Sequence, residues 1–213
     1  MERTVFGKVF MWMFVGLMVT FGTAFYVANS PALAANILGT NLVWGLIIAQ
    51  VGAVIFLSAR AHKMNYGTAA VTFVAYSWLT GLTFSMFFIM YHVSSLIYVF
   101  MITAVVFGIF GLIGYFTKLD LTKIRTYLLV GLIAVILARV ANIWIGMGDL
   151  DMMLTYAIIV IFVGFTAYDI QKIKRNMTQI HNQNSLAIVS ALSLYLNFIN
   201  LFIALLRLFG DRR

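Results

Sequence analysis

The sequence predicts an all-α polytopic membrane protein with seven transmembrane helices, and three observations lead to this fold class. Of the 213 residues, 63% are hydrophobic and 9% are charged, whereas a soluble domain carries about a quarter charged residues. The chain contains one proline, so its long apolar runs are free to be helical. Seven of these runs have close to the ~20 residues that an α-helix needs to cross a bilayer.

The predicted spans follow one another with short polar connections. They cover residues 9–27, 37–59, 67–91, 94–116, 126–147, 152–171 and 186–209. We therefore expect a single seven-helix transmembrane domain over residues 1–213. The first run is longer than the roughly 7–15 apolar residues of a signal peptide. We interpret it as a retained helix, although Ala32, Leu33 and Ala34 resemble a cleavage site.

The distribution of Lys and Arg predicts the orientation of the chain. Ten of these residues precede the first span or follow the second, fourth and sixth spans. The positive-inside rule then places the N-terminus of a multi-pass membrane protein in the cytoplasm. Arg207, Arg212 and Arg213 would lie on the opposite side. This leaves two alternatives open, namely that the tail is tolerated there or that the last segment does not fully cross.

The net charge of +8 has an explanation in the membrane. Basic residues in short loops set topology and meet anionic lipid headgroups, so nucleic acid is not an expected partner. The chain has no cysteine, which excludes thiol catalysis and disulfides. Its histidines lie near span ends or in loops and lack metal-ligand spacing. The spans also lack a serine–histidine pair and a second aspartate for proteolysis, so we expect no enzyme activity and no cofactor.

Polar side chains within the spans are the candidate functional residues, because ionisable groups are costly in a bilayer. In the last span a polar stripe follows one helical face, and it consists of Ser190, Ser193, Asn197, Asn200 and Arg207. For the two serines, interhelical hydrogen bonding is the simpler explanation. For the two asparagines we favour a role in lining a pathway.

Asp169 is the one acid within or at the edge of a predicted span, and two interpretations stay open. The first is a boundary carboxylate that Lys172 neutralises from position i+3. The second is a buried carboxylate that is held by a cation such as Arg60 and acts as a switch or a cation ligand.

Three further features have structural explanations. Arg139 interrupts the fifth span, and its long side chain can extend to the lipid headgroups. The acidic connection at Asp149 and Asp151 is expected to be a solvated hairpin, with a cation-attracting mouth as the alternative. A small-residue seam for close helix packing is predicted at Gly108, Gly111 and Gly114.

Four segments give the sequence a family resemblance. Tyr168–Lys172 ends the sixth span, Leu192–Phe202 lies in the last span, and Leu79–Thr83 lies in the third. Together with Leu205–Gly210, they resemble the transmembrane BAX inhibitor motif family over essentially the whole chain. The resemblance implies seven helices with the last one central in the bundle. It also implies a pH-sensitive calcium leak attributed to one aspartate on each of the last two helices and an arginine on the second.

The chain departs from this pattern at the second aspartate. Asp169 matches the first aspartate and Arg60 is the candidate for the arginine, but Asn197 occupies the position of the second aspartate. An Asp–Asn pair imitates a half-protonated pair of carboxylates permanently, so we expect a weakened pH switch. Gln50 also stands where some relatives carry glutamate. Because calcium prefers six to eight oxygen ligands with carboxylates among them, we expect conduction to be weak, less selective or absent.

Two functions are compatible with these observations. The first is a calcium (cation) leak channel gated at Asp169, Asn197 and Arg60, with Asp169 as the calcium ligand. The candidate pore-lining residues are Gln50, Ser193, Asn200 and Arg207. Calcium would then be the permeant ion and not a cofactor. The second is a non-conducting regulator that binds other membrane proteins, such as a protease or a stress-response partner. For both we expect a monomer or weak oligomer in the lipid bilayer.

Overall fold

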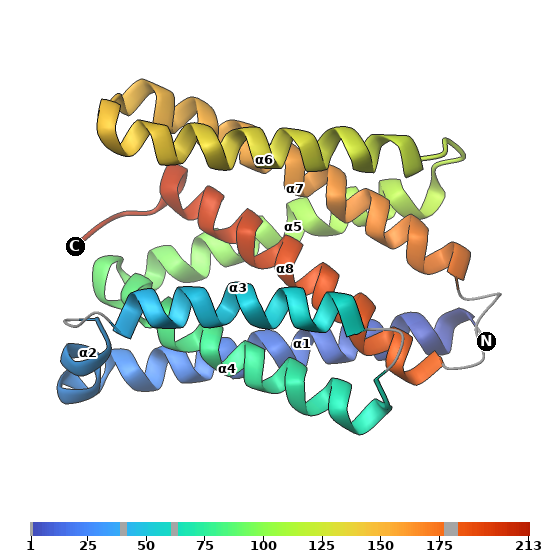
Figure 1. Ribbon diagram of the computed structural model, residues 1–213, viewed down its shortest axis with the longest axis horizontal. Helices are drawn as coiled ribbons and strands as arrows, with labels where there is room; N and C mark the ends of the chain where they lie inside the picture. The colour runs from blue at the N-terminus through green and yellow to red at the C-terminus, as the bar shows by residue number, and fades with distance from the viewer. Residues whose placement is uncertain (1, 39–41, 61–63, 177–182) are drawn as a thin grey trace. The chain divides into compact units, whose positions relative to one another are not determined.

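A computed structural model of the chain describes residues 2–38, 42–60, 64–176 and 183–213, and Figure 1 labels its helices. Every regular element within these ranges is an α-helix, which confirms the all-helical fold class. The elements are α1 (Glu2–Ala28), α2 (Pro31–Leu38), α3 (Leu42–Arg60), α4 (Tyr66–Met90), α5 (Val93–Phe116), α6 (Thr122–Ile145), α7 (Gly148–Asn176) and α8 (Gln183–Phe209).

Within the described ranges, six helices are long and apolar enough to cross a membrane, namely α1, α4, α5, α6, α7 and α8. They correspond to six of the seven predicted spans. The remaining predicted span, 37–59, coincides largely with α3, whose apolar stretch Gly45–Phe56 is shorter. The described residues thus support a multi-pass membrane protein with six candidate spans, and the seventh stays a prediction.

The connection between the first two predicted spans contains a helix that hydropathy does not indicate. Helix α2 begins at Pro31. Proline suits the first position of a helix, because its missing N–H would have no partner there. The alanine-rich segment that follows favours helix, so the chain forms a short helix in place of an extended loop.

Helix α7 is longer than its predicted span of 152–171 at both ends. Asp149 and Asp151 lie in its first turn and Lys174 and Arg175 in its last. Acidic residues at a helix N-terminus and basic residues at its C-terminus are stabilised by the helix dipole. Polar residues therefore extend α7 beyond the apolar window, and the predicted acidic hairpin is in fact the beginning of a helix.

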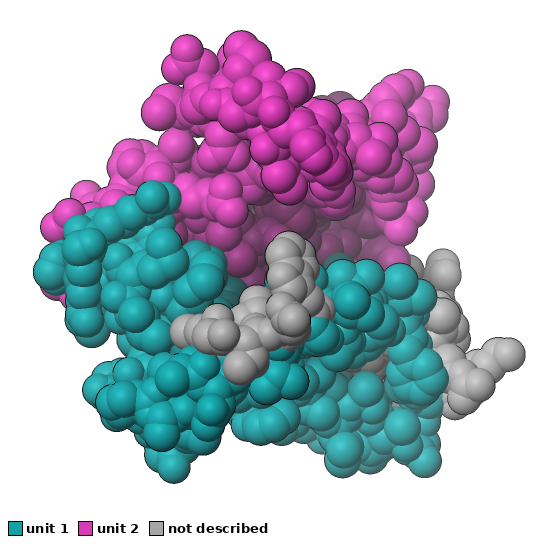
Figure 2. Space-filling model, turned by 60° about the vertical axis from the view of Figure 1, so that its left-hand side comes forward, with its two compact units in different colours: residues 1–93, 179–195, 212–213 teal, residues 94–178, 196–211 magenta. Residues whose placement is uncertain are grey.

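The chain divides into two compact units, which Figure 2 shows in different colours. Unit 1 contains residues 1–93, 179–195 and 212–213, and unit 2 contains residues 94–178 and 196–211. Helix α8 contributes its first half to unit 1 and its second half to unit 2. The single domain over 1–213 and the central position of the last helix stay predictions.

In unit 1, helix α4 packs along α1 and also contacts α3. A buried polar contact lies in this packing, where the hydroxyls of Thr20 and Tyr195 are 2.6 Å apart. The Thr20 hydroxyl also donates to the Ser77 carbonyl at 3.0 Å. The rings of Phe73 and Tyr76 meet the Tyr195 ring edge to face. The first half of α8 is therefore joined to α1 and α4 by both hydrogen bonds and aromatic contacts.

Buried hydroxyls on the helices are satisfied locally. Several donate to the carbonyl four residues earlier in their own helix, as in Ser77 to Phe73, Thr103 to Val99 and Thr166 to Phe162. Such back-bonding satisfies these hydroxyls in apolar surroundings. These side chains are thus structural and do not by themselves mark a site.

In unit 2, helices α6 and α7 form an antiparallel pair (Figure 1). The turn between them has Gly146 in the left-handed conformation, with φ of 74°, which glycine adopts without strain. The Asn142 side chain closes the turn by bonding both the carbonyl and the N–H of Met147. The apolar contact between the two helices centres on Val135, Leu154 and Ile161.

The predicted glycine seam on α5 is in close contact at one of its three positions. A Cβ at Gly114 would overlap the carbonyl of Ala167 on α7 and lie 2.6 Å from its Cα. At Gly111 the nearest atom would be 3.8 Å away, and at Gly108 no atom lies within 4 Å. Close approach of α5 and α7 therefore depends on Gly114.

Replacement of Gly114 by alanine is expected to destabilise the protein by about 1–3 kcal/mol, the usual cost of overpacking. The new methyl group would meet backbone atoms of Ala167, which cannot rotate away. Gly108→Ala on the same helix is the matched control. It should be neutral or slightly stabilising, because alanine is the better helix former. The measurement is the unfolding temperature in detergent, and equal losses in both variants would contradict the contact.

Candidate functional site

Asp169 and Asn197, both predicted from the sequence, meet in unit 2. The Asn197 Nδ2 atom donates to Asp169 Oδ2 at 2.7 Å, which links α8 to α7. Both side chains are buried, with 8% of Asp169 and 5% of Asn197 exposed. A carboxylate accepts hydrogen bonds and an amide nitrogen donates them, so the two groups are complementary. Of the two interpretations of Asp169, this geometry supports the buried carboxylate.

Contacts with α5 hold α7 on both sides of Asp169. Before it, Ala167 lies against Gly114. After it, the Lys174 Nζ atom donates to the Tyr115 carbonyl at 2.8 Å and lies 4.2 Å from the centre of the Tyr115 ring. The carboxylate therefore sits on a stretch of helix that is fixed along its length.

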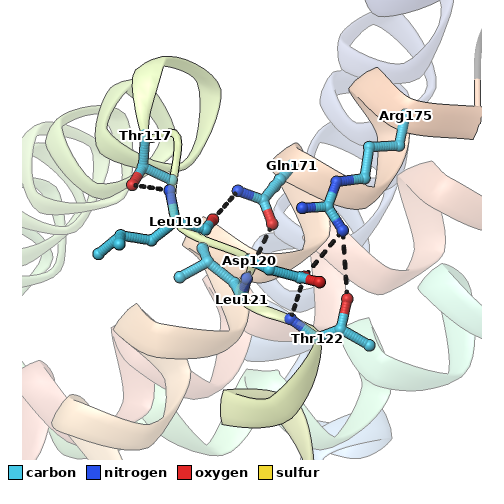
Figure 3. Close-up of polar contacts among 7 residues, drawn as sticks. All are labelled: Thr117, Leu119, Asp120, Leu121, Thr122, Gln171 and Arg175. Carbon is cyan, nitrogen blue, oxygen red and sulfur yellow. Dashed lines mark hydrogen bonds and ion pairs between the residues drawn. The ribbon is translucent and has the colours of Figure 1, made fainter.

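Gln171 on α7 forms hydrogen bonds with the connection that joins α5 and α6, as Figure 3 shows. Its Nε2 atom donates to the Leu119 carbonyl at 2.7 Å, and its Oε1 atom accepts from the Leu121 N–H at 3.0 Å. The side chain is 5% exposed. Because both ends of the buried amide are bonded to backbone, they fix the position of this connection relative to α7.

Arg175 binds the same connection through an ion pair (Figure 3). Its Nη1 atom lies 2.8 Å from Asp120 Oδ1, and the Thr122 N–H donates to the same oxygen at 2.9 Å. Hydrogen bonds from the Thr122 hydroxyl and backbone amide, and then from Arg175, hold the pKa of Asp120 well below its ordinary value. An exposed pair of this kind contributes little to stability, so its effect is to order the connection locally.

Asn197 and Asn200 differ in what they bind, although both belong to the predicted stripe. Asn200 donates from Nδ2 to the Leu196 carbonyl of its own helix at 2.7 Å. Beside Asn197, the Phe198 ring packs against the rings of Phe100 and Phe107 on α5, at centroid distances of 5.3 and 5.5 Å. In unit 2, Asn197 thus links two helices, whereas the amide of Asn200 bonds within one.

Gln50, a predicted lining residue, lies in unit 1. Its Nε2 atom donates to the Leu79 carbonyl and to Thr83 Oγ1, both at 3.0 Å. These partners begin and end the Leu79–Thr83 segment on which the family resemblance partly rests. The half-buried Gln50 amide joins α3 to α4 by hydrogen bonds. Its contacts in this structure are therefore those of a residue that holds two helices together.

The remaining predicted residues are spread along the chain. Ser193 is half-buried on α8. The Arg207 Nη1 atom lies 3.7 Å from Asp151 Oδ1, which is also 3.4 Å from Arg139 Nε. Asp151 is therefore engaged in ion pairs, while its side chain stays 48% exposed. The Arg60 side chain lies outside the described residues, and its pairing with Asp169 stays a prediction.

Three residues that connect separate elements of the structure were not predicted as site residues from the sequence, namely Tyr195, Gln171 and Arg175. Tyr195 and Gln171 belong to the family-like segments Leu192–Phe202 and Tyr168–Lys172, so membership of those segments was an available signal. Arg175 stands in the basic last turn of α7, where a helix C-terminus attracts cations. Their partners lie on other elements, and no local pattern indicates them.

The described residues include no group of three or more His, Asp or Glu side chains placed to hold a metal ion. A calcium ion at Asp169 would need carbonyl, amide or water oxygens to complete its six to eight ligands.

Comparison with known proteins agrees with the resemblance. A family model described as "Inhibitor of apoptosis-promoting Bax1" matches residues 2–213. The chain is 44% identical to the inner membrane protein YbhL of Escherichia coli over 218 residues, which cover 99% of this chain and 93% of that protein. It is 36% identical to a protein of Borreliella burgdorferi over 211 residues, covering 97% and 91% of the two chains. Identity to a protein of Deinococcus radiodurans is 32% over 213 residues, with coverage of 99% and 91%.

Replacement of Asn197 by alanine should lower the stability by about 1–3 kcal/mol, because it removes a donor from a buried carboxylate. Asn200→Ala is the matched control on the same helix. Its amide bonds within α8, so its loss should change stability by no more than about 0.5 kcal/mol. Thermal unfolding in detergent gives both values, and equal effects would contradict a special role for the Asn197 contact.

The bonds of Asp120 should depend on pH in a defined direction. Because its pKa is lowered in the folded state, these bonds are fully present above the unfolded pKa of about 4 and are lost as the pH falls toward the folded value. The Thr122 amide should therefore be protected from hydrogen exchange at neutral pH and lose protection in acid. Asp120→Asn should remove this pH dependence, and Asp149→Asn should not. Protection in acid equal to that at neutral pH, after correction for intrinsic exchange rates, would contradict the assignment.

Proposed function

Because the chain belongs to the Bax inhibitor family of multi-pass membrane proteins, we propose that it is a calcium (cation) leak channel of the inner membrane, gated at Asp169, Asn197 and Arg60. The observation that carries the proposal is the buried 2.7 Å hydrogen bond between Asn197 and Asp169. It joins two candidate spans at a carboxylate, which is a costly group in a bilayer.

The amide at Asn197 supports a weak response to pH. Two adjacent carboxylates share a proton, because both cannot ionise cheaply, and they titrate as a pair. Asn197 donates from its amide where a protonated acid would donate from its hydroxyl. Because the amide does not titrate, the contact persists over a pH range in which a pair of acids would separate.

Calcium in this proposal is the transported ion, and no cofactor or enzyme activity is involved. One carboxylate offers few of the charged oxygens that calcium prefers, which supports weak and less selective conduction. The lining candidates are Gln50, Ser193, Asn200 and Arg207. Of these, Gln50 and Arg207 would have to leave their present partners in order to line a pathway.

The proposed orientation has the N-terminus in the cytoplasm, as the Lys and Arg pattern predicts. A contact in unit 1 supports a last helix that crosses fully. The Arg213 N–H donates to the Met90 carbonyl at 2.9 Å, and Arg212 lies over the Tyr91 ring. Met90 and Arg213 are in contact, so they lie on the same membrane face, and the chain between them must cross the membrane an even number of times. The four helices α5 to α8 lie between these residues, so the count is even only if α8 crosses along with the other three. The basic tail is then tolerated on the outer side.

Calcium uptake into dye-loaded proteoliposomes at pH 6 and pH 8 tests the channel. The chain should leak above protein-free liposomes, with little difference between the two conditions. Asn197→Asp should restore a steep dependence, up to about tenfold per pH unit for a single coupled proton. Asn200→Asp adds the same charge one turn further along α8, where the native amide bonds within its own helix, and should stay shallow.

Absence of uptake above protein-free liposomes, in both the chain and Asn197→Asp, would overturn the channel. The second candidate would then be favoured, which is a non-conducting regulator that binds other membrane proteins. Equal pH dependence in Asn197→Asp and Asn200→Asp would contradict the gate but not the leak.

A further inference from the structure

Charged side chains from three helices meet in unit 2. Asp151 in the first turn of α7 places its Oδ1 atom 3.4 Å from Nε of Arg139 on α6. The same oxygen lies 3.7 Å from Nη1 of Arg207, near the end of α8. Arg139 also donates from Nη2 to Thr155 Oγ1 at 2.7 Å. The Arg139–Asp151–Arg207 cluster thus contains two positive charges and one negative charge.

Asp149 does not balance the remaining positive charge of this cluster. It lies in the same helical turn as Asp151 but two residues earlier, and residues at this spacing do not share a helix face. Its side chain is exposed to the surroundings. The excess positive charge is therefore available to an anion from outside the protein.

The donors of the two arginines are only partly used. Both distances to Asp151 exceed the roughly 2.7–2.9 Å of a charge-assisted hydrogen bond. The Nε atom of Arg139 is buried and has no hydrogen-bond partner within the described structure. The Arg207 side chain is 41% exposed, so a ligand can reach the cluster. A guanidinium offers five N–H donors in a planar fork that matches a phosphate.

The cluster lies beside a helix surface that is open to lipid. Only 6% of the apolar window of α6 is buried. The half of α6 that carries Arg139 leaves Leu137, Ile143 and Trp144 exposed by 64%, 77% and 78%. Tryptophan concentrates at the membrane interface, at the level of the headgroups. Arg139 in this half of α6, and Arg207, which shares Asp151 with it, are therefore near the level of lipid phosphates.

We propose that Arg139 and Arg207 bind the phosphodiester group of an anionic lipid headgroup, while an acyl chain of that lipid lies along the exposed face of α6. The excess positive charge selects an anionic phospholipid over a zwitterionic one, whose own ammonium group it repels. This site is separate from the Asp169–Asn197 contact and does not depend on the proposed channel function.

Native mass spectrometry of the intact chain in detergent tests the site, with phosphatidylglycerol and phosphatidylcholine titrated separately. Phosphatidylglycerol should be retained at least about fivefold more strongly, which is the gain expected per basic residue near a headgroup. Arg207→Gln should lower this preference by about fivefold, and the double variant with Arg139→Gln should abolish it. Lys123→Gln removes the same charge at the other end of α6 and should leave the preference unchanged.

Asp151→Asn distinguishes a ligand site from a purely structural ion cluster. At a ligand site, loss of the competing carboxylate raises the retention of phosphatidylglycerol. In a structural cluster, the same change lowers the unfolding temperature and leaves retention unchanged, which would overturn the proposal. Circular dichroism verifies that each variant folds. If the variants with Arg139→Gln do not fold, Arg207→Gln alone still tests the site, because Arg207 lies at the exposed end of α8.

Inorganic phosphate separates the two possible sources of the anion. At millimolar concentration it should not displace phosphatidylglycerol, because the acyl chains contribute to binding. Displacement would overturn the lipid assignment in favour of a soluble anion. Equal retention of the two lipids, or an unchanged preference in Arg207→Gln, would overturn the site itself.

Discussion

The interior of a bilayer holds no water, so each polar group on a spanning helix needs a partner within the protein. This constraint explains the main contacts of both units. Hydroxyls bond back to their own helices, Gln50 bonds to α4, and the Asp169 carboxylate accepts from Asn197. An amide meets the constraint more cheaply than a second acid, because it brings no additional charge to be neutralised. The same constraint favours the ion pairs of Asp151 with the arginines of α6 and α8.

Prediction from the sequence succeeded where one local physical signal dominates. The length of the apolar runs predicted seven spans, and six of them coincide with described helices that are long and apolar enough to cross a membrane. The cost of charge in a bilayer pointed to Asp169, and the polar face of the last span pointed to Asn197. That these two residues form a pair was implied by the family resemblance, because no spacing along the chain relates positions on separate helices. Their separation and burial came from the structure.

Contacts between helices were beyond prediction, because hydropathy does not encode which faces meet. Gln171 stood at the polar end of a predicted span, yet it is 5% exposed and bonded at both ends of its amide. Arg139 was expected to extend to the headgroups, and the contacts of its guanidinium with Asp151 and Thr155 on α7 were not predicted. Helix ends were misplaced for a related reason. An apolar window ends at the first charges, whereas α7 continues to Asn176 through residues that suit its dipole.

Helix α7 carries the buried carboxylate and the anchor of the α5–α6 connection only two residues apart. This is about 3 Å along the axis of an α-helix, too short a length for the helix to bend between them. A movement of α7 that separates Asp169 from Asn197 must therefore drag the backbone at Leu119 and Leu121 along with it, or break both bonds of Gln171. The connection is therefore coupled mechanically to α7. It includes Leu119, whose side chain is 72% exposed. The exposed surface at Leu119 is thus linked through Gln171 to the buried contact on α7.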